Sequence, residues 1–251
     1  MSTTMGDADI AKVADLVADP GRSRILLALG DGRALAASTL AAEAGVAAST
    51  ASSHLTKLVA GGLLAVERHG RHRYYRLAGP RVGELLESLA RIAPAAPVRS
   101  LRQGTRAHAV RVARTCYDHL AGRLGTALMT AFLDESLLSG GDGIFHADGS
   151  DRLSSPGRGD VTYSLTERGR GRLSAFGVTV SSRSRRPLIR YCIDWSEQRH
   201  HLAGALGAAV LTRLVGLGWV RRPTVGRAVY LTESGRRGLE DEFAVVLADD
   251  E

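Results

Sequence analysis

Two short segments of this 251-residue chain repeat each other, and both of its cysteines stand beside them. The heptapeptide HLAGRLG begins at His119, and HLAGALG begins at His201. A Cys-x-Asp triplet precedes each heptapeptide, starting at Cys116 and at Cys192. Thiol, imidazole and carboxylate groups bind metals, react with oxidants or hold polar ligands. If the two repeats lie together in the fold, these groups form one pocket.

The residues predicted to bind an effector in this pocket are polar or aromatic and lie in or near the repeats. They are Cys116, Tyr117, His119, Cys192, Asp194, Trp195 and His201. Three kinds of site stay open. A soft-metal or arsenite site uses the cysteines with one or more histidines, a redox switch uses one cysteine of low pKa, and an organic effector needs a cavity beside the aromatic rings. These residue types are compatible with a metal ion or a small-molecule effector and do not distinguish between them.

The repeat also has an explanation without any ligand. Ala121 with Gly125, and Ala203 with Gly207, place small residues one helical turn apart, where two helices can approach closely. Small and apolar residues at helical spacing most often belong to a core. Packing between the repeats, without any ligand, is therefore an alternative to the ligand-binding hypotheses.

Both repeats are predicted to lie on long helices. Apolar residues at helical spacing predict one helix over residues 106–138, on which Cys116 and His119 share a face. A second helix is predicted over residues 194–217, with Asp194 as its N-cap. Because this second helix has no internal turn signal, we do not expect it to form a helix-turn-helix. The C-terminal half is therefore predicted to serve sensing or assembly.

Composition restricts the class of protein. With 44% apolar residues the chain can bury a core, and its formal net charge of +7 comes mainly from arginine, since Lys12 and Lys57 are the only lysines. Such a basic chain suggests a phosphate-bearing partner. The sequence shows no signal peptide and no membrane span, so we expect a cytoplasmic protein with free thiols. Glycine-rich phosphate loops, nucleophile elbows and metalloprotease helices are absent from it, so an enzyme is not predicted.

The first hundred residues predict short helices followed by a hairpin. Asp19 and Pro20 begin a helix that glycines end near Gly30, and another short helix runs from Ser38 to Gly45. The segment AASTASSHLTKLVAGGLL predicts a helix with an apolar face and an opposite face of small polar residues. LLAVERHGRHRYYRL then alternates as a hairpin with a basic tip. Two short helices joined around a glycine and followed by such a wing are typical of a winged helix-turn-helix, which binds DNA.

The predicted DNA contacts are polar or basic side chains on the second of these helices and on the wing. They are Ser49, Thr50, Ser52, Ser53, His54, Lys57, Arg68, Arg71 and Arg73. The helix would face the major groove or its phosphates, and the wing would contact phosphates or reach into the minor groove. The alternative is a winged helix used for protein contacts alone, which would make the chain an adaptor.

Residues 9–93 resemble the winged helix-turn-helix domain of the ArsR/SmtB family of bacterial repressors. The resemblance lies in DPGRSRILLAL, LAAEAGVAASTASSHLTKLVAGGLL and the basic wing, about one third of the chain. It implies a recognition helix over Ala48–Ala60 and a homodimer formed by the helices over residues 10–18 and 81–92. Such a dimer binds a palindromic operator in double-stranded DNA.

Two features depart from that family. Ala48 and Ser53 stand where the family often has glutamine and arginine, so base contacts are expected to rely on Ser49, Thr50, Ser52 and the wing. The metal sites of the family are also missing, because LAASTLAAEA has no cysteine and RVGELLESLARI has no histidine.

Further internal similarity marks the second half. LTRLVGLGWVRRPTVGRAVYL from Leu211 is similar to the helix, glycine stop and hairpin that start at Leu55. YSLTERGRGRL from Tyr163 is similar to VYLTESGRRGL from Val229. The second half therefore resembles winged-helix material.

These patterns predict a mainly α-helical chain with small β-hairpins, an α+β fold. A winged helix-turn-helix domain (1–93) is followed by a linker (94–104) and a winged-helix-like sensor domain (105–251). The predicted function is a sequence-specific DNA-binding transcriptional regulator, a dimeric repressor controlled by a ligand at the C-terminal domain. The alternatives are the adaptor without specific DNA binding and a thiol- or metal-sensing repressor that uses Cys116 and Cys192.

Overall fold

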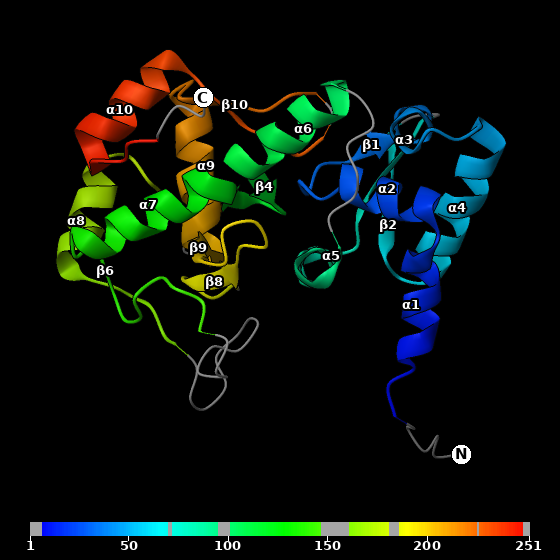
Figure 1. Ribbon diagram of the computed structural model, residues 1–251, viewed down its shortest axis with the longest axis horizontal. Helices are drawn as coiled ribbons and strands as arrows, with labels where there is room; N and C mark the ends of the chain where they lie inside the picture. Colours follow the sequence, from blue (N-terminus) through cyan, green and yellow to red (C-terminus); the bar gives the residue numbers. More distant parts are fainter. Residues whose placement is uncertain are drawn as a thin grey trace. The chain divides into compact units, whose positions relative to one another are not determined.

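The computed structural model describes residues 7–69, 72–94, 101–146, 161–180, 186–224 and 226–247. Its contacts divide the chain into two units, unit 1 (Met1–Val82) and unit 2 (Gly83–Glu251). Figure 1 labels the helices and some of the strands. The predicted α+β class is confirmed, because helices alternate with small antiparallel strand pairs. Over the described ranges, no helix combines the length and the apolar character needed to cross a bilayer.

Unit 1 has the predicted winged helix-turn-helix arrangement. Its helices are α1 (Ile10–Ala18), α2 (Pro20–Ala28), α3 (Ala37–Ala44) and α4 (Ala48–Ala60), and its strands are β1 (Leu35–Ala36), β2 (Leu64–His69) and β3 (His72–Leu77). The three strands form one sheet in the order β1-β3-β2. The predicted helices over 10–18 and 48–60 and the predicted hairpin are confirmed.

Local sequence signals explain why these helices begin and end where they do. The Asp19 carboxylate accepts a hydrogen bond from the Arg22 backbone N–H (2.8 Å) and caps α2, with Pro20 as the first helical residue. α3 ends at Gly45, whose φ of +64° is left-handed and favours glycine. The chain then turns within three residues into α4, which buries Leu55 and Leu58. The turn and the apolar face together set the direction of α4.

α5 (Pro80–Ile92) begins in unit 1 and continues into unit 2. Within unit 2 its two carboxylates pair with arginines. Glu84 Oε1 lies 3.5 Å from Arg190 Nη1, and Glu87 Oε2 lies 3.1 Å from Arg114 Nη2. The boundary between the two units therefore falls within α5.

Unit 2 contains two similar halves, each made of a hairpin, a helix, a short strand pair and a second helix. The first half is β4 (Arg114–Cys116), β5 (His119–Ala121), α7 (Gly122–Asp134), β6 (Leu138–Ser139), β7 (Ser164–Leu165) and α8 (Glu167–Ala175). The second half is β8 (Arg190–Ile193), β9 (His200–Ala203), α9 (Gly204–Gly216), β10 (Val220–Arg221), β11 (Tyr230–Leu231) and α10 (Glu233–Phe243). α6 (Leu101–Val112) precedes both halves (Figure 1).

Matching threonines show how closely the two halves correspond. Thr166 is the N-cap of α8, and its hydroxyl also donates to the Leu137 carbonyl oxygen (3.1 Å). Thr232 is the N-cap of α10, and its hydroxyl donates to the Trp219 carbonyl oxygen (3.0 Å). In each half one side chain thus fastens the start of the second helix to the segment that follows the first helix. The sequence similarity between the segments from Tyr163 and Val229 therefore corresponds to the same local structure, a short strand followed by a threonine-capped helix.

The two long helices predicted for unit 2 are wrong. Residues 106–138 form the end of α6, the β4–β5 hairpin and the shorter helix α7, which begins at Gly122. Residues 194–217 contain strand β9 and the shorter helix α9, which begins at Gly204. Both glycines have a left-handed φ, +78° and +79°, and a Cβ on either would lie within 3.0 Å of a backbone atom. Asp194 consequently lies directly after strand β8 and is not the N-cap of α9, a position that Ala203 occupies. Short buried strands and buried helix segments have the same apolar pattern, so periodicity did not distinguish them.

The two halves pack crosswise, because β5 contacts α9 and β9 contacts α7. A Cβ on Gly125 of α7 would lie 3.6 Å from the Cβ of His201, and a Cβ on Gly207 of α9 would lie 3.1 Å from the Cβ of His119. The small residues therefore allow a helix to approach a strand, rather than a second helix. The surrounding core is apolar and includes Leu124, Leu128, Phe132, Leu206, Val210 and Leu214.

Candidate nucleic-acid interface and cysteine–histidine cluster

The outer face of α4 is lined by small polar side chains. Ser49, Thr50, Ser52, Ser53 and Lys57 are all exposed. The opposite face is buried, since Ala51, Leu55 and Leu58 have 0–1% of their surface exposed. Five of the predicted helix contacts therefore lie on the side of α4 that is free of the core.

His54 differs from the other predicted contacts on α4. Its side chain is 14% exposed, and its Nε2 lies 3.5 Å from Asp19 Oδ1 at the start of α2. The hydrogen bond from the Arg22 backbone N–H holds the pKa of Asp19 below its usual value, so this carboxylate is ionised at neutral pH. The ring thus lies against α2, and a DNA contact by His54 stays a prediction.

The wing places two arginines directly opposite each other. Arg68 and Arg73 are cross-strand partners in the β2–β3 ladder, and both are exposed. Among the residues that the structure describes, no carboxylate forms an ion pair with either. Like charges opposite each other destabilise a strand pair, so a bound anion would relieve the repulsion. The third predicted wing residue, Arg71, lies outside the described residues.

In unit 2 the two hairpins bring the cysteines and histidines together. Cys116 pairs with His119 across β4–β5, and Cys192 pairs with His201 across β8–β9. One donor atom of each residue lies within 4.8 Å of those of the other three, and all four residues are buried. The predicted common helical face of Cys116 and His119 is wrong, because both lie on strands. We call these four residues the tetrad.

A carboxylate stands behind each histidine of the tetrad. Asp118 Oδ1 lies 3.4 Å from His119 Nδ1, and Asp194 Oδ2 lies 3.2 Å from His201 Nδ1. The Nε2 atoms of His119 and His201 are buried, and within the described part of the chain neither has a hydrogen-bond partner. Nδ1 of His119 is hydrogen-bonded to Asp118, whereas Nδ1 of His201 approaches Asp194 without forming a hydrogen bond, and the Nε2 atoms of both rings have no partner among the described residues.

Burial and neighbouring groups shift the pKa values in the tetrad. Burial disfavours the charged ring of His201, but the Asp194 carboxylate and the Cys116 sulfur outweigh it and raise the pKa of His201 to about 9. A hydrogen bond with Cys192, together with burial, raises the pKa of the Cys116 thiol far above its ordinary value. A reactive redox cysteine needs a lowered pKa, so these surroundings do not favour the redox switch.

Asp194 also belongs to a buried ion-pair network that the sequence did not predict. It accepts hydrogen bonds from the backbone N–H groups of Gly122 (2.6 Å) and Ser196 (3.0 Å), and it lies 3.0 Å from Arg114 Nη2. Arg114 is fully buried and also pairs with Glu87. The repeated Arg-x-Cys-x-Asp pattern at Arg114 and Arg190 was the signal that could have revealed it.

The two aromatic residues predicted for the effector site lie beside the tetrad and not within it. The Trp195 ring lies under the Arg114 guanidinium, at 4.7 Å from its Cζ to the ring centroid. Tyr117 occupies the two-residue turn between β4 and β5 with a left-handed φ of +60°. Its side chain would be 3.4 Å from a Cβ on Gly83 of α5. The predicted set therefore divides into a donor cluster and its surroundings.

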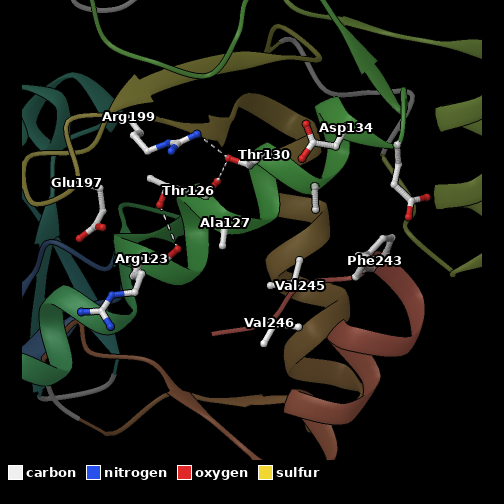
Figure 2. Close-up of a pocket in the computed structure, with 13 residues that line it drawn as sticks. Arg123, Thr126, Ala127, Thr130, Asp134, Glu197, Arg199, Phe243, Val245 and Val246 are labelled. Carbon is white, nitrogen blue, oxygen red and sulfur yellow. Dashed lines mark hydrogen bonds between the residues drawn. The ribbon is translucent and has the colours of Figure 1, made fainter. Parts of the chain in front are cut away.

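A separate groove of about 400 Å³ lies on the other side of α7. Its lining comprises Arg123, Thr126, Ala127, Thr130, Ala131, Asp134, Glu135, Glu197, Arg199, Phe243, Ala244, Val245 and Val246. Figure 2 shows Arg199 reaching Thr130 on α7, with Val245 and Val246 across the groove. None of the seven predicted effector residues lines this groove.

Comparisons with known proteins agree with the fold of unit 1 and extend over the whole chain. A family model described as a helix-turn-helix domain matches residues 17–67. The HTH-type transcriptional regulator YdfF of Bacillus subtilis (strain 168) is 38% identical over 239 residues, which cover 94% of this chain and 98% of that protein. The HTH-type transcriptional regulator CmtR of Mycobacterium tuberculosis (strain ATCC 25618 / H37Rv) is 34% identical over 92 residues, 37% of this chain and 77% of that protein.

Among solved structures, the homodimeric winged helix-turn-helix DNA-binding domain of Mb0332 from Mycobacterium bovis is 31% identical, covering 34% of this chain and 86% of that chain with a TM-score of 0.30. The match to YdfF spans residues of both units of this chain. The chain belongs to the HTH-type transcriptional regulators, and the predicted ArsR/SmtB-type winged helix-turn-helix is its DNA-binding part.

Proposed function

We propose that this regulator is a dimeric repressor that binds a palindromic operator through α4 and the wing. The observation that carries the proposal is the exposed hydroxyl face of α4, with Arg68 and Arg73 paired opposite each other on the adjoining hairpin. An α-helix with a slim polar face fits the major groove, and arginines on a hairpin reach phosphates or the minor groove. Ser49, Thr50 and Ser52 supply the hydrogen-bonding groups for the base edges.

The dimer is proposed from α1. This helix has no buried residue, and its apolar side chains Ile10 and Val13 are 76% and 37% exposed. Arg22 donates to the backbone carbonyl oxygens of Asp15 (2.6 Å) and Leu16 (2.7 Å), which fixes the end of α1 against α2. A fixed helix with an uncovered apolar face suits pairing with the same helix of a second copy.

The remaining parts of the proposal concern organisation. We assign DNA binding and dimerisation to residues 1–93, a linker to 94–104 and control by a bound effector to 105–251. α9 buries six of its 13 residues and follows a hairpin instead of a helix and turn, which supports a role for unit 2 other than reading DNA. A cytoplasmic location accords with binding to a bacterial operator.

The wing contacts can be tested by salt dependence. The double variant Arg68→Ala/Arg73→Ala is expected to lower the slope of log K against log salt concentration by about 2, because each lost phosphate contact contributes about 0.9. Binding should weaken to a similar extent on specific and non-specific DNA, since phosphates carry no sequence information. Fluorescence anisotropy with DNA from upstream of the protein's own gene, over a series of salt concentrations, measures both.

A charge-matched control comes from unit 2. Arg170 and Arg237 are 60% and 70% exposed and pair weakly with glutamates of their own helices, so Arg170→Ala/Arg237→Ala removes the same charge without touching the wing. An unchanged slope in the wing variant would remove Arg68 and Arg73 from the interface. A wild-type protein that protects no DNA sequence at all would favour the adaptor alternative.

A further inference from the structure

We propose that Cys116, His119, Cys192 and His201 bind one Zn²⁺ ion, which joins the two halves of unit 2. Each half supplies one cysteine and one histidine, placed opposite each other on a hairpin. The site goes beyond the proposed function, because its existence does not depend on operator binding or on dimerisation.

The tetrad is compact enough for a metal site with four protein ligands. Its donor atoms lie within 4.8 Å of one another. Zinc with sulfur at about 2.3 Å and nitrogen at about 2.0 Å needs donors roughly 3.3 to 3.8 Å apart. An inward movement of about 1 Å, within the reach of side-chain rotations, therefore forms the site. Because the four donors come from segments about 80 residues apart, the ion would hold both hairpins at once.

The histidines provide a second and independent observation. His119 and His201 are 5% and 0% exposed, and each keeps a buried Nε2 without a hydrogen-bond partner in the described residues. A buried polar atom without a partner costs free energy, and a metal bond removes that cost. Asp118 and Asp194 stand at the Nδ1 atoms. A carboxylate at Nδ1 fixes the tautomer that offers Nε2 to a metal, an arrangement typical of histidine ligands.

Charge balance favours a divalent ion. Two thiolates and two neutral imidazoles around Zn²⁺ sum to zero, which suits a site without water. The carboxylates behind the histidines already have cationic partners, since Asp118 pairs with Arg186 and Asp194 with Arg114. A univalent ion such as Cu⁺ would leave one uncompensated negative charge. With four protein ligands the site is closed, as structural zinc sites are, whereas catalytic sites keep an open position.

His200 supplies a matched control beside the tetrad. It follows β8 and precedes His201 on β9, is 1% exposed, and its Nδ1 lies 2.7 Å from the Tyr163 hydroxyl. Adjacent residues of a strand point to opposite faces, so His200 does not join the tetrad. Asp142 with His146 (2.8 Å) forms a second carboxylate–histidine pair, which is exposed and contains no member of the tetrad, for use as another control.

The test measures metal binding by the full-length chain. Protein purified under reducing conditions is analysed for metal, stripped with a chelator and titrated with Co²⁺ in place of Zn²⁺. We expect one ion per chain, the visible absorption of tetrahedral Co²⁺, and the near-ultraviolet band of cobalt–thiolate bonds, which Zn²⁺ then abolishes. Cys116→Ser and His201→Gln should lose stoichiometric metal and these bands, whereas His200→Gln should keep them.

A milder variant guards against loss of folding. Asp118→Asn changes a side chain that is 30% exposed and leaves all four ligands in place, and it should weaken Zn²⁺ binding about 10- to 100-fold. Asp142→Asn should leave the affinity unchanged. A folded, reduced wild-type chain that binds no Zn²⁺ overturns the proposal, as does a Cys116–Cys192 disulfide that forms in its place. Since no DNA is involved, failure here would leave the proposed repressor function intact.

Discussion

Arg114 of unit 2 has a guanidinium group that is entirely buried, so its charge loses its hydration on folding. Three groups compensate for its lost hydration: Glu87 at 3.1 Å, Asp194 at 3.0 Å and the face of Trp195 at 4.7 Å. Burial alone would lower the pKa of Arg114, but the two carboxylates outweigh it and keep the charge in place. Removing a partner from such a network leaves an uncompensated charge, which costs far more than the pair contributes in water.

Glu87→Gln is therefore expected to lower the free energy of unfolding by about 3 kcal/mol at neutral pH. Burial raises the pKa of Glu87, but Arg227 and Arg114 outweigh burial and hold it below its usual value. The folded-state pKa is then below the unfolded value of about 4.3, so the ionised carboxylate stabilises the fold above that pH. This contribution is lost as the pH falls through the folded-state pKa, and the difference between wild type and variant should shrink in acid.

Urea unfolding followed by tryptophan fluorescence measures this difference, since Trp195 and Trp219 are the only tryptophans and both belong to unit 2. Glu233→Gln is the control: its carboxylate is 75% exposed and 3.9 Å from Arg237, so the change should be under about 0.5 kcal/mol. A Glu87 variant that is equally destabilised at every pH would show that packing, rather than charge, explains the effect.

Among the secondary-structure elements, the hairpins of unit 2 position the tetrad, and helix α1 of unit 1 carries the proposed dimer surface. A strand pair sets cross-strand neighbours side by side, so each hairpin of unit 2 presents a cysteine and a histidine together. α1 differs from α2, α3 and α4 because none of its residues is buried and its apolar side chains Ile10 and Val13 are exposed. These exposed apolar side chains, on a helix whose end is held by Arg22, are the basis for the proposed dimer.

Ile10→Asp/Val13→Asp should weaken the proposed dimer by at least about 100-fold in Kd. Burying one isoleucine contributes about 1.5 to 3 kcal/mol, and a symmetric interface loses each side chain twice. Sedimentation velocity over a dilution series measures the monomer–dimer equilibrium. Val246→Asp alters an exposed valine of unit 2 (68% exposed) and should leave the equilibrium unchanged. Persistence of the dimer in the α1 double variant would show that another surface forms it.

At the scale of the whole molecule, the chain combines a winged helix-turn-helix with a duplicated unit and connects them through α5. The duplication gives unit 2 a buried tetrad built from equivalent residues of both halves, with one carboxylate beside each histidine. α5 carries Glu84 and Glu87, whose partners Arg190 and Arg114 start the strands that bear Cys192 and Cys116. Ion pairs therefore join α5 to the first residue of a strand in each half of unit 2.

The dimer proposed here also predicts the form of the operator. Two copies of α4 related by a two-fold axis should protect two inverted half-sites whose centres lie about 10 base pairs apart, or a multiple of that spacing. Footprinting of the region upstream of the gene with the full-length protein measures this spacing. The α1 double variant, used at a concentration where it is monomeric, should bind a single half-site far more weakly. Protection of one asymmetric site by the wild-type protein would contradict the two-fold arrangement.

Local sequence signals, such as helix caps and apolar faces, were sufficient to predict the helices and the wing of unit 1. Asp19 with Pro20 and the left-handed Gly45 bound α2 and α3, and the apolar face through Leu55 and Leu58 defines α4, so the recognition helix and the wing were predicted within a residue or two. The repeat was visible as well, and with it the seven residues of the predicted effector site, four of which form the tetrad.

The tertiary structure alone decided that these repeats are hairpins and that their donors meet. A short buried apolar run satisfies the pattern of a helix and of a strand equally, and what separates them here is the crosswise packing of β5 on α9 and β9 on α7. The buried pairing of Arg114 with Glu87 and Asp194 depends on the same packing. Contacts between segments about 80 residues apart follow from how whole elements pack against one another, and no local propensity specifies them.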